Sequence, residues 1–314
     1  MKSSMIIHPD ELSGAWIDKL ADAGITTLGI HPVGGNTATE SLTEMLALMK
    51  TDGYRRLIDH ARVRGLSVEY EIHAGGYLMP RELFEEKPEY FRVDADGKRT
   101  NDKNFCVSNR EALDLVAKRG KELALSLYGS SHTFNLWLDD GYDTRCHCPK
   151  CSSLSASDQQ MLVLNEMLRS IRKHIPNAEL SYLAYVDTVL PPSKILPDDG
   201  IFLEYAPFQK YTAKGEDAMS LIEREKDMIA PLMRIFSKAP CKVLEYWYDN
   251  SMLSEWKNPP KRFVLNEMDM TADIEEYRRM GFENIATFAC YLGDDYKELY
   301  GEVDVSPFAN AVTT

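Results

Sequence analysis

Two adjacent carboxylates and a group of cysteines follow one apolar segment of this 314-residue chain. The stretch Thr133–Cys151 reads TFNLWLDDGYDTRCHCPKC, and its apolar residues predict a buried strand that stops at Asp139 and Asp140. Parallel α/β folds place their chemistry at such strand ends. Two acids in one enclosed site cannot both ionise freely, so one pKa should rise towards that of a general acid. A turn with an Asx cap is the structural alternative.

The cysteines that follow the acids have a spacing typical of a metal knuckle. Cys146, Cys148 and Cys151 form C-x-C-x-x-C, which is poorly suited to disulfides among the three. Tetrahedral zinc takes four thiolate or imidazole ligands, so a fourth ligand must come from elsewhere. We prefer Cys106 to the local His147 for this position. The sequence therefore predicts a structural zinc ion, with free thiols or a disulfide as the alternative.

Strand and helix patterns alternate along the whole chain. The segments expected to be strands are Met5–Pro9, Thr26–His31, Ser67–His73, the strand before the two aspartates, Leu180–Val189, Ile201–Pro207, Lys242–Asp249 and Asn284–Tyr291. Eight strand–helix units in series predict an α/β fold, a single (β/α)8 TIM barrel formed by residues 1–314 as one domain. An extended loop after strand 3, rich in proline and aromatic residues, is expected to be a lid or binding wall, and a cysteine-rich loop follows strand 4.

In such a barrel the carboxyl ends of the strands share one face, where the active site lies. Besides the two aspartates, these ends carry His8, His31, His73, Tyr185, Glu204, Tyr205, Glu245, Tyr246, Trp247 and Tyr291. Carboxylates and aromatic rings together suit sugars, whose hydroxyls take charge-assisted hydrogen bonds while their C–H faces stack on rings. Each side chain taken alone also fits a packing role, so the joint placement carries the prediction of a carbohydrate site.

Composition limits the partners and the compartment. The net charge of -13, from 49 acids against 36 bases, argues against nucleic acid and against anionic membranes as partners. We find no segment that resembles a membrane span or a signal sequence. If the sequence is complete, we expect a soluble, cytoplasmic protein with reduced cysteines, although removal of a signal peptide would leave the same pattern. The oligomeric state stays open.

A distinctive order of motifs runs between Leu78 and Gly293. The motifs are, in chain order, Pro80-x-x-Leu83-Phe84-x-x-x-Pro88-x-Tyr90-Phe91, Asp96-Gly97-Lys98-Arg99, Cys106-x-x-Asn109, the Asp-Asp and C-x-C-x-x-C stretch, Ala184-Tyr185 and Pro191-Pro192. This order resembles that of a bacterial family of glycoside-hydrolase-like barrels that is classed as a domain of unknown function. The resemblance implies a barrel and a sugar-related role, and the proline and aromatic lid is also similar to that of α-glucuronidases.

Two narrower resemblances concern the site residues. The four cysteines are similar to the zinc cluster of certain β-galactosidases, which implies Cys106 as the fourth ligand, although those enzymes have Asn-Glu in place of Asp139-Asp140. The Asp-Asp pair resembles that of enzymes that cleave N-acetylglucosamine from proteins, and more loosely the β-hexosaminidases. That likeness implies Asp140 as acid/base and Asp139 as the residue that steadies the substrate acetamide. Because Asp139 shares a strand side with Trp137, the reverse assignment stays open.

We therefore predict a glycoside hydrolase-like enzyme that acts on a neutral or N-acetylated sugar by carboxylate acid/base catalysis. A two-carboxylate mechanism with Asp140 as acid and Glu245 as nucleophile or base is the rival, although Glu245 also fits a buried structural anion. A catalytically inactive carbohydrate-binding barrel is the alternative from another class. A zinc-dependent hydrolase is less favoured, because four protein ligands leave no open position and the histidines lack a metal-binding spacing.

Overall fold

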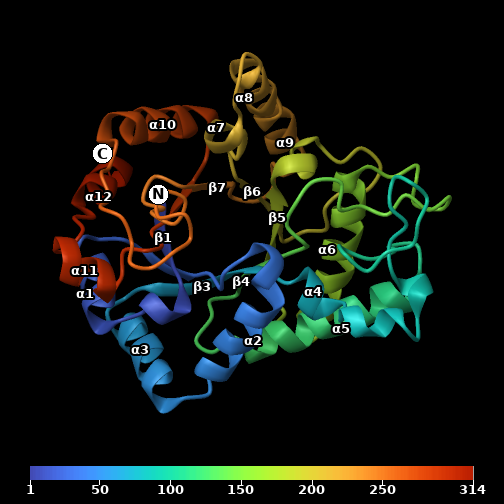
Figure 1. Cartoon of the computed structure of the whole chain (residues 1–314), viewed down its shortest axis with the longest axis horizontal. Helices are drawn as coiled ribbons and strands as arrows, with labels where there is room; N and C mark the ends of the chain where they lie inside the picture. Colours follow the sequence, from blue (N-terminus) through green and yellow to red (C-terminus); the bar gives the residue numbers. More distant parts are fainter. Residues whose placement is uncertain (314) are drawn as a thin grey trace.

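The computed structural model describes residues 1–313 and contains a closed parallel barrel, which confirms the predicted fold (Figure 1). Each strand pairs with the next in sequence, and β8 closes on β1. The strands are β1 (Lys2–Ile7), β2 (Thr27–Ile30), β3 (Ser67–His73), β4 (Thr133–Trp137), β5 (Glu179–Ala184), β6 (Ile201–Tyr205), β7 (Lys242–Glu245) and β8 (Asn284–Phe288). Their continuous burial matches the apolar runs of the sequence, since helices cover the outside of the barrel.

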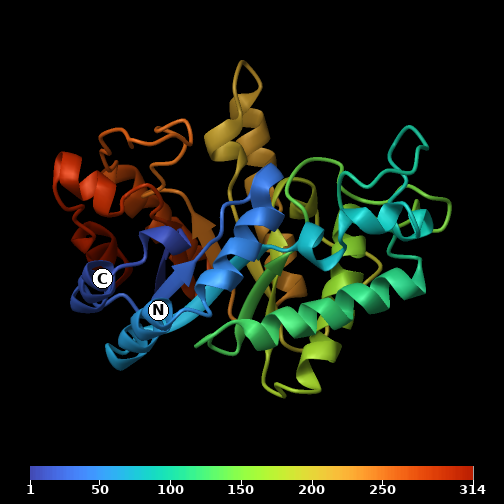
Figure 2. The ribbon, with the colours of Figure 1, turned by 60° about the horizontal axis from the view of Figure 1, so that its bottom comes forward.

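Helices fill the connections between the strands and surround the barrel (Figures 1 and 2). They are α1 (Gly14–Asp22), α2 (Ala38–Leu48), α3 (Asp52–Val63), α4 (Gly75–Leu78), α5 (Arg110–Ser126), α6 (Ala156–Arg172), α7 (Gln209–Thr212), α8 (Ala218–Asp227), α9 (Ile229–Ile235), α10 (Glu267–Met280), α11 (Asp294–Tyr300) and α12 (Ser306–Thr313). Among residues 1–313, none of them combines the length and apolar character that a membrane span requires.

Several strands end earlier than the sequence predicts, and the difference is largest for β5 and β7. β5 stops at Ala184, and a 3-10 turn over Val186–Val189 follows it. Val186 has φ of 52°, a left-handed conformation that no strand can continue through. β7 stops at Glu245, because the chain then turns and the Asp249 amide donates to the Tyr246 carbonyl at 3.0 Å. The apolar and aromatic residues beyond both strand ends belong to loops over the barrel.

The barrel interior holds a charged layer. The Nζ atom of Lys242 lies 2.8 Å from Glu204 and 3.7 Å from Glu69, and it also contacts Glu71. Burial, together with neighbouring Glu204, raises the pKa of Glu71. One cation among three carboxylates thus favours a protonated Glu71 below the mouth of the barrel.

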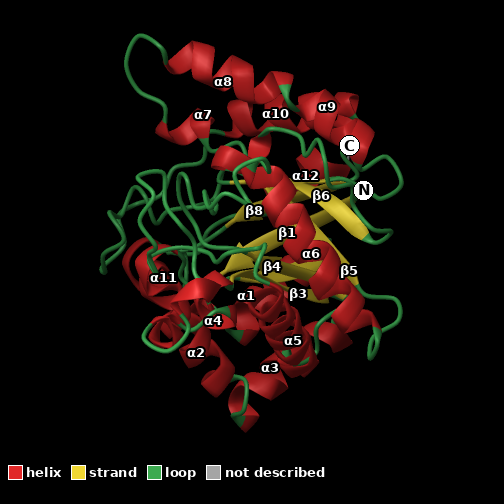
Figure 3. Cartoon of the chain, turned by 90° about the vertical axis from the view of Figure 1, so that its right-hand side faces the viewer, coloured by secondary structure: helices red, strands yellow, loops and turns green. Residues whose placement is uncertain are grey.

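The loop after β3 is long and folded. It contains α4, two 3-10 turns and short antiparallel bridges that pair Phe91 with Phe105 and Val93 with Arg99. Figure 2 shows this segment above α5, and Figure 3 shows the loops gathered at the end of the barrel opposite the N-terminus. The loop therefore lies where a wall of an active site is expected.

Candidate active site

A cavity of about 620 Å³ lies at the carboxyl ends of the strands. Aromatic rings line much of it, and the lining includes neither lysine nor arginine. The side chain of Trp256 is 63% exposed at the cavity wall, so its ring offers a face on which a sugar ring can stack. The lining rings are Trp137, Tyr185, Phe208, Tyr246, Trp256 and Phe288.

Three histidines from consecutive strand ends form one side of this cavity. The Nδ1 atoms of His8, His31 and His73 lie 2.8, 2.7 and 3.1 Å from the backbone carbonyls of His31, Glu71 and Leu138, respectively. Because a carbonyl only accepts, each Nδ1 carries the proton, and Nε2 remains for a ligand. Burial, with the nearby His8 and His73, lowers the pKa of His31, which keeps that ring neutral.

The two adjacent aspartates take different positions. Asp140 lines the cavity, whereas Asp139 forms an ion pair with Arg81 of the loop after β3. Because β4 ends at Trp137, the alternation of the strand does not continue to the acids. A Cβ atom at Gly75 would lie 2.6 Å from the Asp139 carboxyl, so this close approach requires glycine.

The loop after β3 also holds the backbone of both acids. Lys103 donates to the Asp140 carbonyl at 2.6 Å, and the Asp139 amide donates to the Asn104 side chain at 2.9 Å. The sequence identified this loop as a lid but gave no signal for these contacts. The loop therefore fixes the position of the two acids.

Asp249, which follows β7, is a second carboxylate in the cavity. Burial raises its pKa, although the backbone and side chain of Ser251 and the nearby His8 act in the opposite direction. Burial and the charges of both Asp249 and Asp140 raise the pKa of Tyr246, so this tyrosine lies within the field of both acids. The sequence analysis missed Asp249, and its place at the end of the predicted seventh strand was the available signal.

The structure does not bring Glu245, Tyr205 or Trp247 into the cavity. Glu245 is fully buried, and it accepts hydrogen bonds from Lys210, Tyr211 and Tyr277. The alternation of β7 turns this side chain outward, towards α7 and α10. Glu245 therefore does not face the mouth of the barrel, although the sequence had led us to expect that it would. Its contacts instead support the alternative, a buried anion with a cationic partner.

Tyr205 faces the helices because of the alternation of β6, and Trp247, which lies beyond the end of β7, faces α10. The hydroxyl of Tyr205 donates to Glu225 at 3.2 Å, and Trp247 Nε1 donates to Asp273 at 2.9 Å. Glu204 faces inward but lies below the cavity floor, where Trp137 Nε1 donates to it at 2.9 Å. His31, His73, Tyr185 and Tyr246 are the predicted binding residues that do line the cavity.

The four cysteines of the predicted metal site come together. The ligand atoms of Cys106, Cys146, Cys148 and Cys151 all lie within 4.8 Å of one another. The Sγ atom of Cys106 is 3.7 Å from that of Cys148 and 3.9 Å from that of Cys151. Tetrahedral zinc with bonds of about 2.3 Å separates its sulfur ligands by about 3.8 Å, so the four thiols fit this ion.

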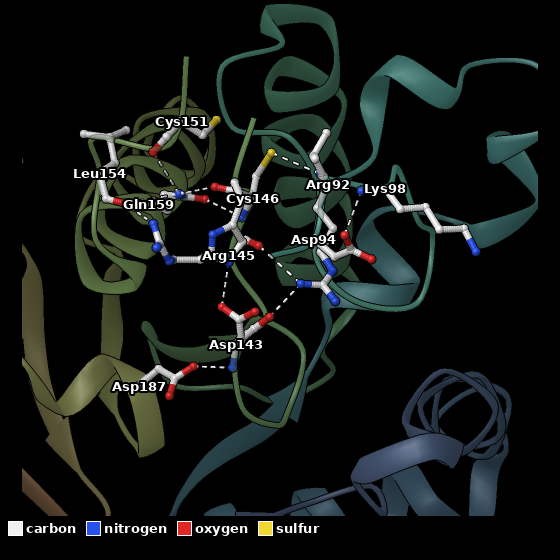
Figure 4. A network of polar contacts seen from close by, with 12 residues as sticks. Arg92, Asp94, Lys98, Asp143, Arg145, Cys146, Cys151, Leu154, Gln159 and Asp187 are labelled. Carbon is white, nitrogen blue, oxygen red and sulfur yellow. Dashed lines mark hydrogen bonds and ion pairs between the residues drawn. The ribbon is translucent and has the colours of Figure 1, made fainter. Parts of the chain in front are cut away.

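The imidazole of His147 lies outside this group, since Nε2 pairs with Asp143 at 2.6 Å. Figure 4 shows how the segment is held: Arg92 donates to the Asp143 carbonyl at 2.6 Å, and Gln159 bonds the amide and the carbonyl of Cys146. The cysteine cluster thus joins the loop after β3 to the segment that follows the two acids.

The histidines of the cavity do not converge on one ion. Among residues 1–313, the other group close enough to hold a metal consists of His8, Glu11 and Cys290. Glu11 accepts from the amides of His8, Leu292 and Gly293, so its carboxylate already has backbone partners. This geometry gives no support to a catalytic metal held by the strand-end histidines.

These features place the chain among the glycoside-hydrolase-like (β/α)8 barrels. Residues 46–233 match the family described as Domain of unknown function (DUF4838), and the chain belongs to this family. The family match and the barrel thus confirm the resemblance that the motifs indicated. No curated protein sequence matches the chain.

Solved structures of similar fold carry names of carbohydrate-active enzymes. A β-galactosidase from Rahnella sp. R3 has a TM-score of 0.59 and 13% identity, and the alignment covers 100% of this chain and 55% of that one. Endo-glycoceramidase II from Rhodococcus sp. has a TM-score of 0.56 and 11% identity, with 92% and 73% covered. A xyloglucanase from Bacteroides ovatus has a TM-score of 0.52 and 15% identity, with 96% and 67% covered. The chain therefore spans about half the length of the β-galactosidase, and the likeness at these identities concerns the fold.

Proposed function

We propose that this protein is a glycoside hydrolase that cleaves a glycosidic bond of a neutral or N-acetylated sugar, with Asp140 as acid/base. The observation that carries this proposal is the placement of Asp140 and Asp249 in one ring-lined cavity at the carboxyl ends of the strands. Two carboxylates and stacking surfaces are what hydrolysis of a sugar requires. The names of the structural neighbours agree with this substrate class.

Each carboxylate has a distinct task in this proposal. Asp140 protonates the leaving oxygen, and Asp249 acts at the anomeric carbon, either directly or through a water molecule. The three histidine Nε2 atoms bind sugar hydroxyls. Tyr246 lies close enough to both acids for their charges to raise its pKa. Asp139, neutralised by Arg81, positions Asp140 and is not assigned to the substrate acetamide.

The test is a screen of aryl glycosides, including N-acetylhexosaminides and glucuronides, against the parent protein, Asp140→Asn and Asp249→Asn. We expect the parent to cleave at least one of them and each variant to lose about 100-fold or more in kcat while keeping its fold. A parent that binds sugars but cleaves none of them would point instead to a carbohydrate-binding barrel without catalysis.

We further propose that the four thiols hold a structural zinc ion. The support is their mutual distance, their burial and the fit to tetrahedral sulfur ligation. Four protein ligands close the coordination sphere, so the ion would supply folding energy to the loops and no chemistry to the substrate. Metal analysis of the purified protein, with a stoichiometry of one, tests this assignment.

A further inference from the structure

A second cavity of about 430 Å³ adjoins the main one. The two cavities share Gly35, Asn36, His73 and Asp140 in their linings. Asp140 therefore lies at the boundary between them, and a ligand longer than one sugar can extend past this acid in both directions. The second cavity would receive the part of the ligand beyond the bond that Asp140 protonates.

The chemistry of the second cavity differs from that of the first. Arg81, Lys103 and Arg119 line it, whereas the first cavity has no such cation. Arg81 is neutralised by Asp139. Glu40, Glu82 and Asp102 also line the second cavity, but all three are exposed, so water screens their charges, and Asp102 is paired with Arg92. Asp140 is the acid that this lining shares with the first cavity.

The other two cations have no acidic partner. Lys103 donates to the Asp140 carbonyl at 2.6 Å, and Arg119 donates twice to the Tyr77 carbonyl, at 3.0 and 2.8 Å. Among residues 1–313, no carboxylate lies within ion-pair distance of either side chain, although the chain has 49 acids against 36 bases. Both side chains are half-buried in the cavity wall and fixed by these carbonyls. Two positioned cations that have no ion-pair partner favour an anion from the ligand.

We infer that the second cavity binds a sugar that carries a carboxylate or a sulfate group, with Arg119 and Lys103 as its partners. The substrate would then be an acidic oligosaccharide in which a neutral or N-acetylated unit occupies the ring-lined cavity. This assignment of a substrate class rests on the proposed function. The anion selectivity itself depends only on the second cavity.

The experiment titrates the parent with glucuronate, glucose 6-sulfate and glucose by calorimetry. We expect at least one of the two anionic sugars to bind about tenfold or more tightly than glucose, and high salt to reduce this preference. The better of the two anions identifies carboxylate or sulfate as the recognised group. Equal dissociation constants for all three sugars would overturn the inference.

Substitutions in the second cavity test which residues produce the preference for an anionic sugar. Arg119→Gln and Lys103→Met should each remove most of the preference for the anionic sugar. Lys118→Gln is the control, because it makes an equal charge change at the position before Arg119 in α5 but lies outside the cavity lining, so it should keep the preference. Retained selectivity in Arg119→Gln together with Lys103→Met would sink the proposal.

Turnover separates this inference from the proposed function. If Asp140→Asn keeps the anion preference, the second cavity acts independently of the acid. If no aryl glycoside is cleaved by the parent but glucuronate still binds more tightly than glucose, the hydrolase proposal fails and the anion site stands. If the parent cleaves a glycoside but shows no anion preference, the hydrolase proposal stands and the anion site fails.

Discussion

Trp137 donates its indole Nε1–H to Glu204 at 2.9 Å, and this hydrogen bond joins the floor of the cavity to the charged layer inside the barrel. Glu204 contacts Lys242 at 2.8 Å, and Lys242 in turn pairs with Glu71. The indole ring of Trp137, which a bound sugar would contact, is therefore held in place by the buried charged residues beneath the cavity.

Trp137→Phe should lower the free energy of unfolding by about 1 to 3 kcal/mol, because it leaves a buried carboxylate oxygen without its donor. It should also raise KM for any cleaved glycoside. Trp247→Phe is the control, since it removes an equal 2.9 Å hydrogen bond to Asp273 outside the cavity. Denaturant unfolding and steady-state kinetics measure both effects, and an unchanged KM in Trp137→Phe would contradict the assigned floor.

The activity should depend on the ionisation of Asp249. Burial raises the pKa of this group, and a base or nucleophile must be ionised to act. The kcat/KM value should therefore rise with pH through a pKa above the ordinary value of about 3.9 for aspartate. A pH–rate profile of the parent measures this limb. A limb at the ordinary aspartate value would speak against the role of Asp249.

Glu245→Gln should damage stability more than catalysis. The amide would face Lys210, Tyr211 and Tyr277 in place of the carboxylate that accepts from all three. We expect a loss of about 2 to 4 kcal/mol in unfolding free energy, because two tyrosine hydroxyls and the half-buried Lys210, which keeps Asp273 as a partner, lose a charged acceptor. The folded fraction should keep kcat within about threefold of the parent. A 100-fold fall in kcat with unchanged stability would restore Glu245 as a catalytic candidate.

Lys242→Met should destabilise the protein by about 3 to 5 kcal/mol, because it leaves three buried carboxylates without a cation. The pKa of Glu71 is already raised by burial and by Glu204, so its contribution to stability is present at low pH and is lost as pH rises through this raised pKa. The destabilisation caused by Lys242→Met should therefore be larger at pH 8 than at pH 5. Unfolding curves at both pH values test this, and a pH-independent effect would contradict it.

Cys148→Ser should reduce zinc content below one per chain and lower Tm by about 5 to 10 °C, because the loops joined by the cluster lose a ligand. Cys241→Ser is a matched control, as Cys241 is buried but lies outside the cluster. A strong chelator should lower the Tm of the parent and leave that of Cys148→Ser nearly unchanged. A Cys148→Ser variant with full zinc content and an unchanged Tm would exclude the site.

The sequence alone determined the order of strands and helices, because buried parallel strands and amphipathic helices leave distinct periodic patterns. It also indicated the cysteine set and the strand ends that face the mouth, since the C-x-C-x-x-C spacing and the alternation of strand and helix are local signals. For Asp140, His31 and Tyr246 the end of a strand was sufficient to indicate the site.

Only the tertiary structure decided which side chain enters the cavity after a strand ends. The sequence left open which face of β7 points inward, so it did not reveal that Glu245 and Trp247 point to the helices, and turns beyond β7 place Asp249 in the cavity instead. Likewise, the ion pair between Asp139 and Arg81 joins positions 58 residues apart, which no local pattern records. Contacts of this kind depend on where distant loops meet, and the closure of the barrel brings those loops together.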